Sequence, residues 1–280
     1  MKIFCFIILS ISLISCDSNN KTSHQLEQKT DFSNQILKSE IQNILDSSRL
    51  NGSVLIYDAD SDIFYSNNFD WANRGFLPAS TFKIPNSIIA LETGLVSDDT
   101  TLFKWDGKER RLKIWEQDLT FREAFHYSCV PCYQDIARNI GSYTMNIYLQ
   151  KFNYGTMMVD SNSIDNFWLE GESHISQFQQ IDFLKRFYNS QIPISKRTEL
   201  IMKKLMVIEE NSNFILSGKT GWSIRNGNNN SWFVGYIKTQ NKVYYFATNI
   251  SPNQQFNMDL FPKIRNEITL KSFYQLGLIM

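Results

Sequence analysis

The sequence predicts an α+β fold: a central antiparallel sheet flanked by helices, with an all-helical subdomain inserted at about residues 95–188. Three observations support this prediction. A strand pair is expected early, at residues 52–65, because β-rich segments flank a polar turn. Helical spacing dominates from about residue 95 to 188, and β-rich segments of period two follow residue 213. The 280 residues, 42% of them hydrophobic, are enough to bury a large core.

The chain begins with a segment typical of export signals. Met1-Lys2 gives a positive start, and residues 3–14 form an apolar run that is too short to span a bilayer. The run ends in Leu13-Ile14-Ser15-Cys16, which resembles the bacterial lipoprotein processing box. We interpret residues 1–15 as a signal peptide and Cys16 as the lipidated start of the mature chain; ordinary secretion is the alternative. The expected protein is periplasmic and meets the membrane only through this anchor.

The folded part is expected at residues 32–280, after a flexible polar tether at residues 16–31. Apolar positions at helical intervals predict a first amphipathic helix within residues 32–50. Two strands, residues 52–57 and 63–65, then form the early hairpin.

A helix is next expected from Ser80 to Leu91, with Gly94 ending it. Pro85 lies inside this helix and removes a backbone donor, so the first turn around Ser80 is expected to be tightened or bent. The later helices are expected to restart at 127–131 and run to 140, and to span 143–152, 176–189, 199–206 and 261–276. The three late strands are expected to pair antiparallel, at 215–222, 231–238 and 242–249.

Charge and composition give no reason to expect nucleic-acid binding. Lys plus Arg and Asp plus Glu both number 28, so the formal charge is zero. The three histidines form no cluster, and Cys129 and Cys132 have no second cysteine pair nearby, so no metal site is expected. The C-x-x-C spacing leaves two states open, a disulfide or two buried thiols.

A serine and a lysine three residues apart, Ser80 and Lys83, are the first candidates for chemistry. On a helix they share one face, so the hydroxyl and the amine would lie within hydrogen-bond reach. The N-terminus of that helix would also offer unpaired N–H groups to a developing oxyanion. The pattern indicates covalent catalysis, although S-x-x-K alone also occurs on ordinary exposed helices.

Two more motifs give this pair a context. Ser128-Cys129-Val130 lies in the helical part, and Lys219-Thr220-Gly221 lies in the first late strand. With Ser80-Thr81-Phe82-Lys83, and in this order, they resemble the penicillin-recognising serine enzymes. The S-x-V form of the second motif resembles the class D β-lactamases, the oxacillinase family. Other segments that match this family are Tyr154-Gly155, Phe167-Trp168-Leu169-Glu170-Gly171, Gly218-Lys219-Thr220-Gly221-Trp222 and Ser231-Trp232-Phe233-Val234-Gly235.

The resemblance runs from about Ile36 to the C-terminus and implies the β-lactamase-like fold and a role for each motif residue. Ser80 would be the nucleophile that opens the β-lactam ring and becomes acylated. Lys83 would carry a carbamate formed with carbon dioxide (N6-carboxylysine) and act as general base, with no other cofactor implied. Only a neutral amine forms a carbamate, so the Lys83 pKa is expected to be lowered by burial among Phe82, Val130 and Trp168. The indole N–H of Trp168 would hold the carbamate.

The remaining implied roles concern the leaving group and the substrate. Ser128 would relay a proton to the departing lactam nitrogen. The backbone N–H groups of Ser80 and Trp222 would form the oxyanion hole. Lys219, Thr220 and Arg265 would bind the substrate carboxylate. The full set of implied substrate-binding residues is Val130, Lys219, Thr220, Gly221 and Arg265.

One position departs from the family pattern. Thr156 follows Tyr154-Gly155, where the family usually has asparagine, and a hydroxyl replaces an amide that both donates and accepts. We expect this change to affect loop geometry and substrate preference more than the chemistry. A bridge between Cys129 and Cys132 would stiffen the pocket wall.

The sequence therefore predicts a class D serine β-lactamase that hydrolyses penicillins, small-molecule substrates, and so confers β-lactam resistance. The alternatives are a β-lactam sensor domain and a DD-peptidase-like penicillin-binding protein. A cleavable leader in place of several spanning helices counts against the sensor. The range of β-lactams and the formation of a homodimer are left open by the sequence.

Overall fold

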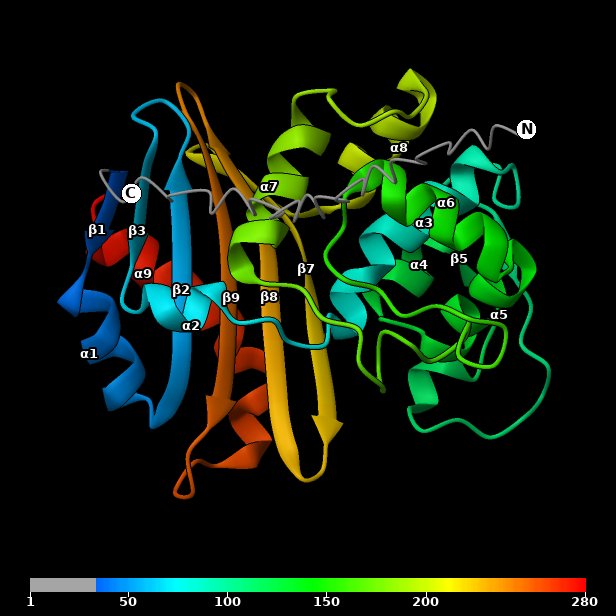
Figure 1. The fold of residues 1–280 in the computed structure, drawn as a ribbon, viewed down its shortest axis with the longest axis horizontal. Coiled ribbons are helices and arrows are strands. Elements are labelled where there is room, and N and C mark those ends of the chain that lie inside the picture. Colours follow the sequence, from blue (N-terminus) through cyan, green and yellow to red (C-terminus); the bar gives the residue numbers. More distant parts are fainter. Residues whose placement is uncertain (1–33) are drawn as a thin grey trace, which may run out of the picture. The chain divides into compact units, whose positions relative to one another are not determined.

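A seven-stranded sheet in the order β1-β3-β2-β9-β8-β7-β6 is the frame of the computed structural model, which describes residues 34–280 (Figure 1). The predicted signal peptide, Cys16 and the tether lie outside the described residues. The strands are β1 (Gln35–Leu37), β2 (Leu50–Asp58), β3 (Ile63–Ser66), β6 (Val207–Glu210), β7 (Phe214–Arg225), β8 (Asn228–Thr239) and β9 (Val243–Pro252). The predicted hairpin and the three late strands are all present, and the α+β fold class is confirmed.

The sheet differs from the prediction at both edges. β1 pairs in parallel with β3, through Ile36 opposite Tyr65, so the sheet is mixed and not purely antiparallel. The helix expected within 32–50 is therefore wrong at its start, because α1 spans only Ser39–Ser47. At the other edge, β6 was not expected; three of its four residues are exposed, and Val207-Ile208 followed by Glu209-Glu210 gives no apolar alternation.

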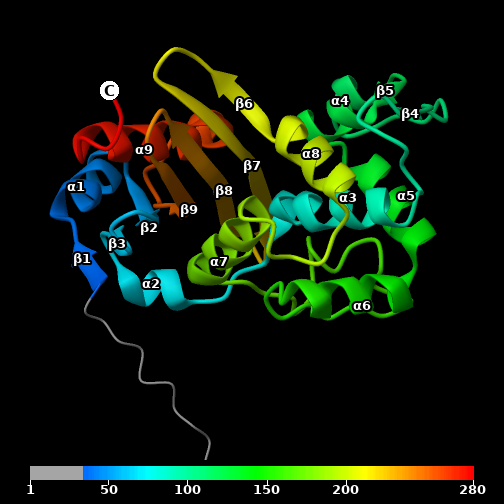
Figure 2. The same cartoon turned by 90° about the horizontal axis from the view of Figure 1, so that it is seen from above.

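Helices cover both faces of the sheet (Figure 2). One face carries α1 and α9 (Phe261–Gln275), which contribute Ile41, Leu45 and Ile268 to an apolar cluster. The opposite face carries α2 (Phe69–Asn73) and α7 (Gln177–Tyr188). Buried Gln177 anchors α7 by donating its side-chain amide to the backbone carbonyls of Ser53 (3.0 Å) and Ala247. The predicted helical region at about 95–188 is thus less uniform than expected, since its last helix, α7, packs on the sheet.

Other helices gather beyond β7 (Figure 1). They are α3 (Lys83–Glu92), α4 (Phe121–His126), α5 (Val130–Ile140), α6 (Ser142–Phe152) and α8 (Lys196–Leu205). A two-stranded sheet, β4 (Leu102–Phe103) with β5 (Leu119–Thr120), interrupts this predicted all-helical region. The short 3-10 helices are η2 (Ala79–Phe82), η3 (Lys113–Trp115) and η4 (Met258–Leu260). Among residues 34–280, no helix combines the length and the apolar character needed to cross a bilayer.

Candidate active site

The Ser80 turn lies where the helical part meets β7. It is a 3-10 helix, η2, that leads directly into α3, which confirms the tightened first turn expected from Pro85. Pro85 is the third residue of α3, where a missing backbone donor costs little because first-turn N–H groups have no intrahelical partner. Ala79 has a positive φ of 50°, a rare conformation for a residue with a side chain. The backbone before the nucleophile is therefore held in a strained form.

Lys83 lies beside Ser80 in a buried setting. Its Nζ donates to the Ser80 Oγ at 3.2 Å and lies 4.7 Å from the ring centre of Tyr133. Only 1% of Lys83 is exposed, and burial lowers its pKa to about 7, because water no longer solvates the ammonium. At neutral pH a large fraction of this amine is uncharged and can act as a base or a nucleophile.

Trp168 packs against the residue between these two groups. Its ring stacks on Phe82 at 5.3 Å, and its backbone carbonyl accepts from the Ala79 N–H at 2.8 Å. The indole Nε1 is buried and has no hydrogen-bond acceptor within residues 34–280. A buried donor left unpaired is costly, so this N–H is suited to an acceptor that a ligand or a modified side chain would bring.

A hydrogen bond joins Ser128 of the helical part to Lys219 of strand β7. The Lys219 Nζ donates to the Ser128 Oγ and, at 3.0 Å, to the Thr220 carbonyl. Ser128 stands between α4 and α5 with a positive φ of 52°, and Val130 begins α5 just after it. Lys219 is 4% exposed, and its pKa is well below the usual value through burial and then the charges of Lys83 and Arg265.

Strand β7 approaches the Ser80 turn at Gly221. A Cβ built on Gly221 would lie 3.1 Å from the Pro78 carbonyl oxygen and 3.1 Å from the Ser80 backbone nitrogen. Only a residue without a side chain allows this approach without displacement. Trp222 follows, and its side chain donates to Asn229 and packs on Phe261 of α9.

Arg265 projects from α9 and is 9% exposed. Its Nη1 donates to the Ser231 Oγ at 2.9 Å, and its buried Nε has no partner within the described chain. Burial lowers the Arg265 pKa to about 10, so the guanidinium stays charged at neutral pH. Ser231 pairs with Trp222 across β7 and β8, which ties Arg265 to the same strand end as Lys219.

The electrostatics of the site favour an anion. Lys83, Lys219 and Arg265 are all buried, and no carboxylate of residues 34–280 influences their pKa values. Arg265 stays charged despite its burial, so an anionic ligand would stabilise this guanidinium and would favour the charged forms of the two lysines. A hydroxyl held by an amine, with cations around it, can perform acyl transfer on a substrate that carries a carboxylate.

Three features of this site were not predicted from the sequence. Tyr133 was not singled out, although it lies three residues after Val130 and so on the same helical face. The positive φ values of Ala79 and Ser128 have no sequence signal, because neither residue is glycine or asparagine. Cys129 and Cys132, whose state was left open, form a disulfide.

Comparison with known proteins gives the family. Residues 49–270 match the penicillin binding protein transpeptidase domain. The β-lactamase OXA-10 of Pseudomonas aeruginosa is 35% identical over 271 residues, which cover 96% of this chain and 97% of that protein. The β-lactamase OXA-48 of Klebsiella pneumoniae is 39% identical, with 78% of this chain and 82% of that protein covered.

Solved structures agree with this assignment. A class D β-lactamase from Sebaldella termitidis superposes with a TM-score of 0.83 at 36% identity, over 88% of this chain and 99% of that one. The class D β-lactamase YbXI from Nostoc has a TM-score of 0.81 at 41% identity, over 85% of this chain and 98% of that one. The chain therefore belongs to the penicillin-binding transpeptidase family and, within it, to the class D β-lactamases, which are serine hydrolases.

Proposed function

We propose that this protein hydrolyses the β-lactam ring of penicillins through an acyl-enzyme on Ser80, with a carboxylated Lys83 as general base, and so confers β-lactam resistance. The observation that carries the proposal is the buried Lys83 amine, which is 3.2 Å from the Ser80 hydroxyl and has a pKa lowered to about 7. An ordinary lysine, charged at neutral pH, can neither accept the Ser80 proton nor combine with carbon dioxide.

The residues present fit a carbamate on Lys83. The unpaired, buried Trp168 N–H calls for an acceptor oxygen, and the lowered Lys83 pKa supplies the neutral amine that carbon dioxide needs. A bound carbamate would supply a base and two acceptor oxygens in place of the amine. Trp168 and Lys83 itself are the residues that would hold it.

The other residues divide the reaction between them. Because the Lys219 Nζ donates to the Ser128 Oγ, the Ser128 hydroxyl proton is free to pass to the lactam nitrogen as the ring opens, and Ser128 would take back the proton that the Lys83 base removes from Ser80. The Ser80 and Trp222 backbone N–H groups would stabilise the oxyanion, supported by the close approach of β7 at Gly221. Lys219, Thr220 and Arg265 would orient the substrate carboxylate, and Val130 would border the substrate.

Turnover of nitrocefin, a chromogenic β-lactam, tests the proposal. We expect sustained hydrolysis that falls when dissolved carbon dioxide is removed and returns with bicarbonate. A single burst of one equivalent, with a stable acyl adduct by mass spectrometry, would instead assign a sensor or a DD-peptidase-like protein. Turnover that is insensitive to bicarbonate would remove the carbamate from the mechanism while keeping the hydrolase.

The Gly221 contact gives a separate prediction. We expect Gly221→Ala to lower kcat/KM for penicillin hydrolysis by about tenfold to a hundredfold, because the new methyl group pushes the Ser80 backbone away from β7. Gly75→Ala is the control outside the Ser80 turn, since the nearest atoms to its Cβ belong to the exposed His174 side chain, which must move to make room. Steady-state kinetics with melting temperatures would check the prediction; an unchanged kcat/KM in the folded Gly221 variant would contradict it.

We also propose that the protein is exported and anchored through a lipid on Cys16. The apolar run at 3–14 before Cys16 supports the proposal, and the Cys129–Cys132 disulfide fits an oxidising compartment. Metabolic labelling with a radioactive fatty acid, compared between the wild type and Cys16→Ala, tests it. Label on both proteins, or on neither, would argue against lipidation at Cys16.

A further inference from the structure

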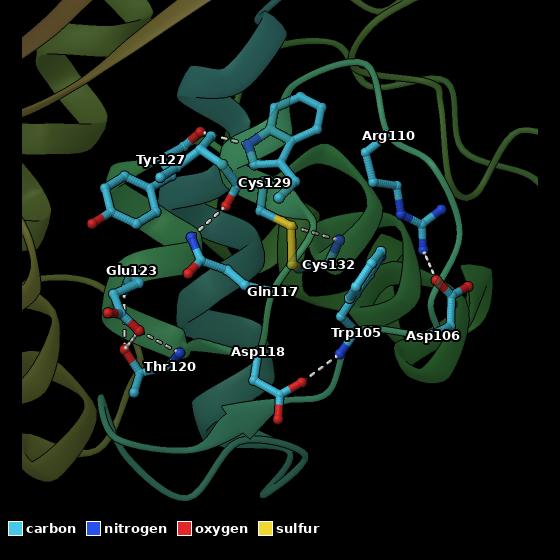
Figure 3. The surroundings of a disulfide bond; sticks show 12 residues. Trp105, Asp106, Arg110, Gln117, Asp118, Thr120, Glu123, Tyr127, Cys129 and Cys132 are labelled. Carbon is cyan, nitrogen blue, oxygen red and sulfur yellow. Dashed lines mark hydrogen bonds and ion pairs between the residues drawn. A yellow bond between two sulfur atoms is a disulfide. The ribbon is translucent and has the colours of Figure 1, made fainter.

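The disulfide between Cys129 and Cys132 closes the first turn of α5 (Figure 3). Cys129 is the N-cap residue, and its sulfur accepts from the Cys132 backbone N–H at 3.2 Å. Sulfur is a weak acceptor, whereas stabilising caps usually present an oxygen. Pro131 between them has no N–H at all. The covalent bond thus holds a turn that hydrogen bonds alone hold poorly.

The residue directly before this turn is Ser128. Its N–H donates to the Phe125 carbonyl at 3.2 Å, and the Cys129 N–H donates to the Ala124 carbonyl at 2.9 Å. Ser128 therefore connects the end of α4 to the start of α5, in a left-handed conformation with φ of 52°. A serine stays in that conformation only where its surroundings hold it there.

Overall stability does not account for so short a bridge. The two cysteines are three positions apart, with Cα atoms separated by 5.4 Å. In the chain-entropy description, a cross-link stabilises a protein less as the loop it closes becomes shorter. A bridge over one helical turn therefore constrains local geometry more than it stabilises the whole fold.

The residues on either side of the constrained turn contact two lysines of the candidate active site. Ser128, just before the turn, accepts from Lys219, and Tyr133, just after it, lies under Lys83. The Tyr133 hydroxyl is fixed independently by Ser87 of α3 at 2.7 Å. Within residues 34–280 the Ser128 hydroxyl has no second side-chain hydrogen bond, so its position depends more on the turn than that of the Tyr133 ring does.

We propose that the Cys129–Cys132 disulfide positions Ser128: it holds the left-handed conformation that keeps the Ser128 hydroxyl against Lys219. The proposal rests on the proposed function, in which Ser128 passes a proton to the lactam nitrogen. Without the bridge, Ser128 relaxes toward an ordinary conformation and its hydroxyl leaves Lys219. Acylation of Ser80 then slows, whereas deacylation, which depends on Lys83, changes little.

A double-mutant cycle tests this coupling. The Cys129→Ala/Cys132→Ala change is made in the wild type and in Ser128→Ala, and acylation and deacylation by a penicillin are measured by stopped flow. In the wild-type background we expect the double-cysteine change to slow acylation about tenfold and to leave the deacylation rate within about twofold of the wild-type rate. In the Ser128→Ala background the same change should have no further effect, which a general loosening of the fold would not produce.

Four outcomes would overturn the proposal. An unchanged acylation rate in the wild-type background would show that the bridge does not act through Ser128. An equal loss of acylation rate in the wild-type and Ser128→Ala backgrounds would show the same. If the Ser128→Ala variant, with its cysteines intact, is acylated at the wild-type rate, Ser128 does not pass the proton to the lactam nitrogen, and this inference fails with that step of the proposed function. If the double-cysteine variant does not fold, the native protein is reduced with a phosphine, which converts the S–S bond to two thiols counted by mass spectrometry. The same tenfold slowing is expected in the reduced protein, and unchanged acylation there would overturn the proposal.

Discussion

Replacing Ser80 with alanine is expected to abolish turnover of nitrocefin and of penicillins. The Ser80 Oγ is the hydroxyl that accepts from the buried Lys83 amine, so its removal takes away the atom that would form the acyl bond. Loss of the nucleophile of a serine hydrolase typically lowers kcat by about 10⁶. Steady-state kinetics would measure the loss, and mass spectrometry of the protein mixed with a penicillin should show no covalent adduct.

Two controls make this result specific. Ser47→Ala changes an exposed serine of α1 that bonds only to its own helix, and it should leave hydrolysis unchanged. The melting temperature of Ser80→Ala should stay close to that of the wild type, because removing one oxygen leaves no large cavity. Sustained hydrolysis by folded Ser80→Ala would mean that another group attacks the ring, and would refute the assignment of the nucleophile.

The linear motifs explain why so much of the site could be predicted. Ser80 and Lys83 lie on one turn, and Lys219 and Gly221 lie on one face of a strand, so local geometry alone places each pair. The approach of Gly221 to the Ser80 turn joins these pairs, but nothing local to either segment encodes that contact. The expectation that these two segments share one site came from the resemblance to the family, because the spacing of residues within each segment does not predict it.

What the sequence could not predict depends on tertiary contacts. Ile36 fits the helical spacing of the residues after it, yet it pairs with Tyr65 at a sheet edge, because an available strand outweighs a weak local preference. The exposed side chains of β6 carry no periodic signal. The resemblance implied roles for Trp168, Lys219 and Arg265, but it did not show that the Trp168 indole N–H is buried without an acceptor or that both basic side chains are buried.

Lys83→Met is expected to abolish hydrolysis and, at the same time, to stabilise the protein at neutral pH in carbon-dioxide-free buffer. Burial lowers the Lys83 pKa from 10.5 to about 7 in the folded state. Between these two values the unfolded chain binds more protons, so wild-type stability rises with pH across this window. Below pH 7 the full cost of burying the ammonium remains, a few kcal/mol. Methionine fills similar space without a charge and avoids that cost.

Thermal unfolding between pH 6 and pH 10.5 would measure this difference. We expect the melting temperature of Lys83→Met to exceed that of the wild type by several degrees near pH 7, since 1 kcal/mol shifts a domain of this size by about 2–4 °C. The gap should close as pH approaches 10.5, where the wild-type amine is neutral in both states. A wild type as stable as the variant at pH 7 would contradict a lowered Lys83 pKa.

Bicarbonate separates the roles of Lys83 and Trp168 in the same measurement. A carbamate forms only on the folded protein's neutral amine, so bicarbonate should raise the wild-type melting temperature and leave Lys83→Met unchanged. Trp168→Phe keeps an aromatic ring beside Phe82 but removes the unpaired N–H, so it should need more bicarbonate for the same rise and the same hydrolysis rate. If Trp168→Phe responds to bicarbonate as the wild type does, the Trp168 N–H does not hold the carbamate, and Lys83 acts without the help of this indole.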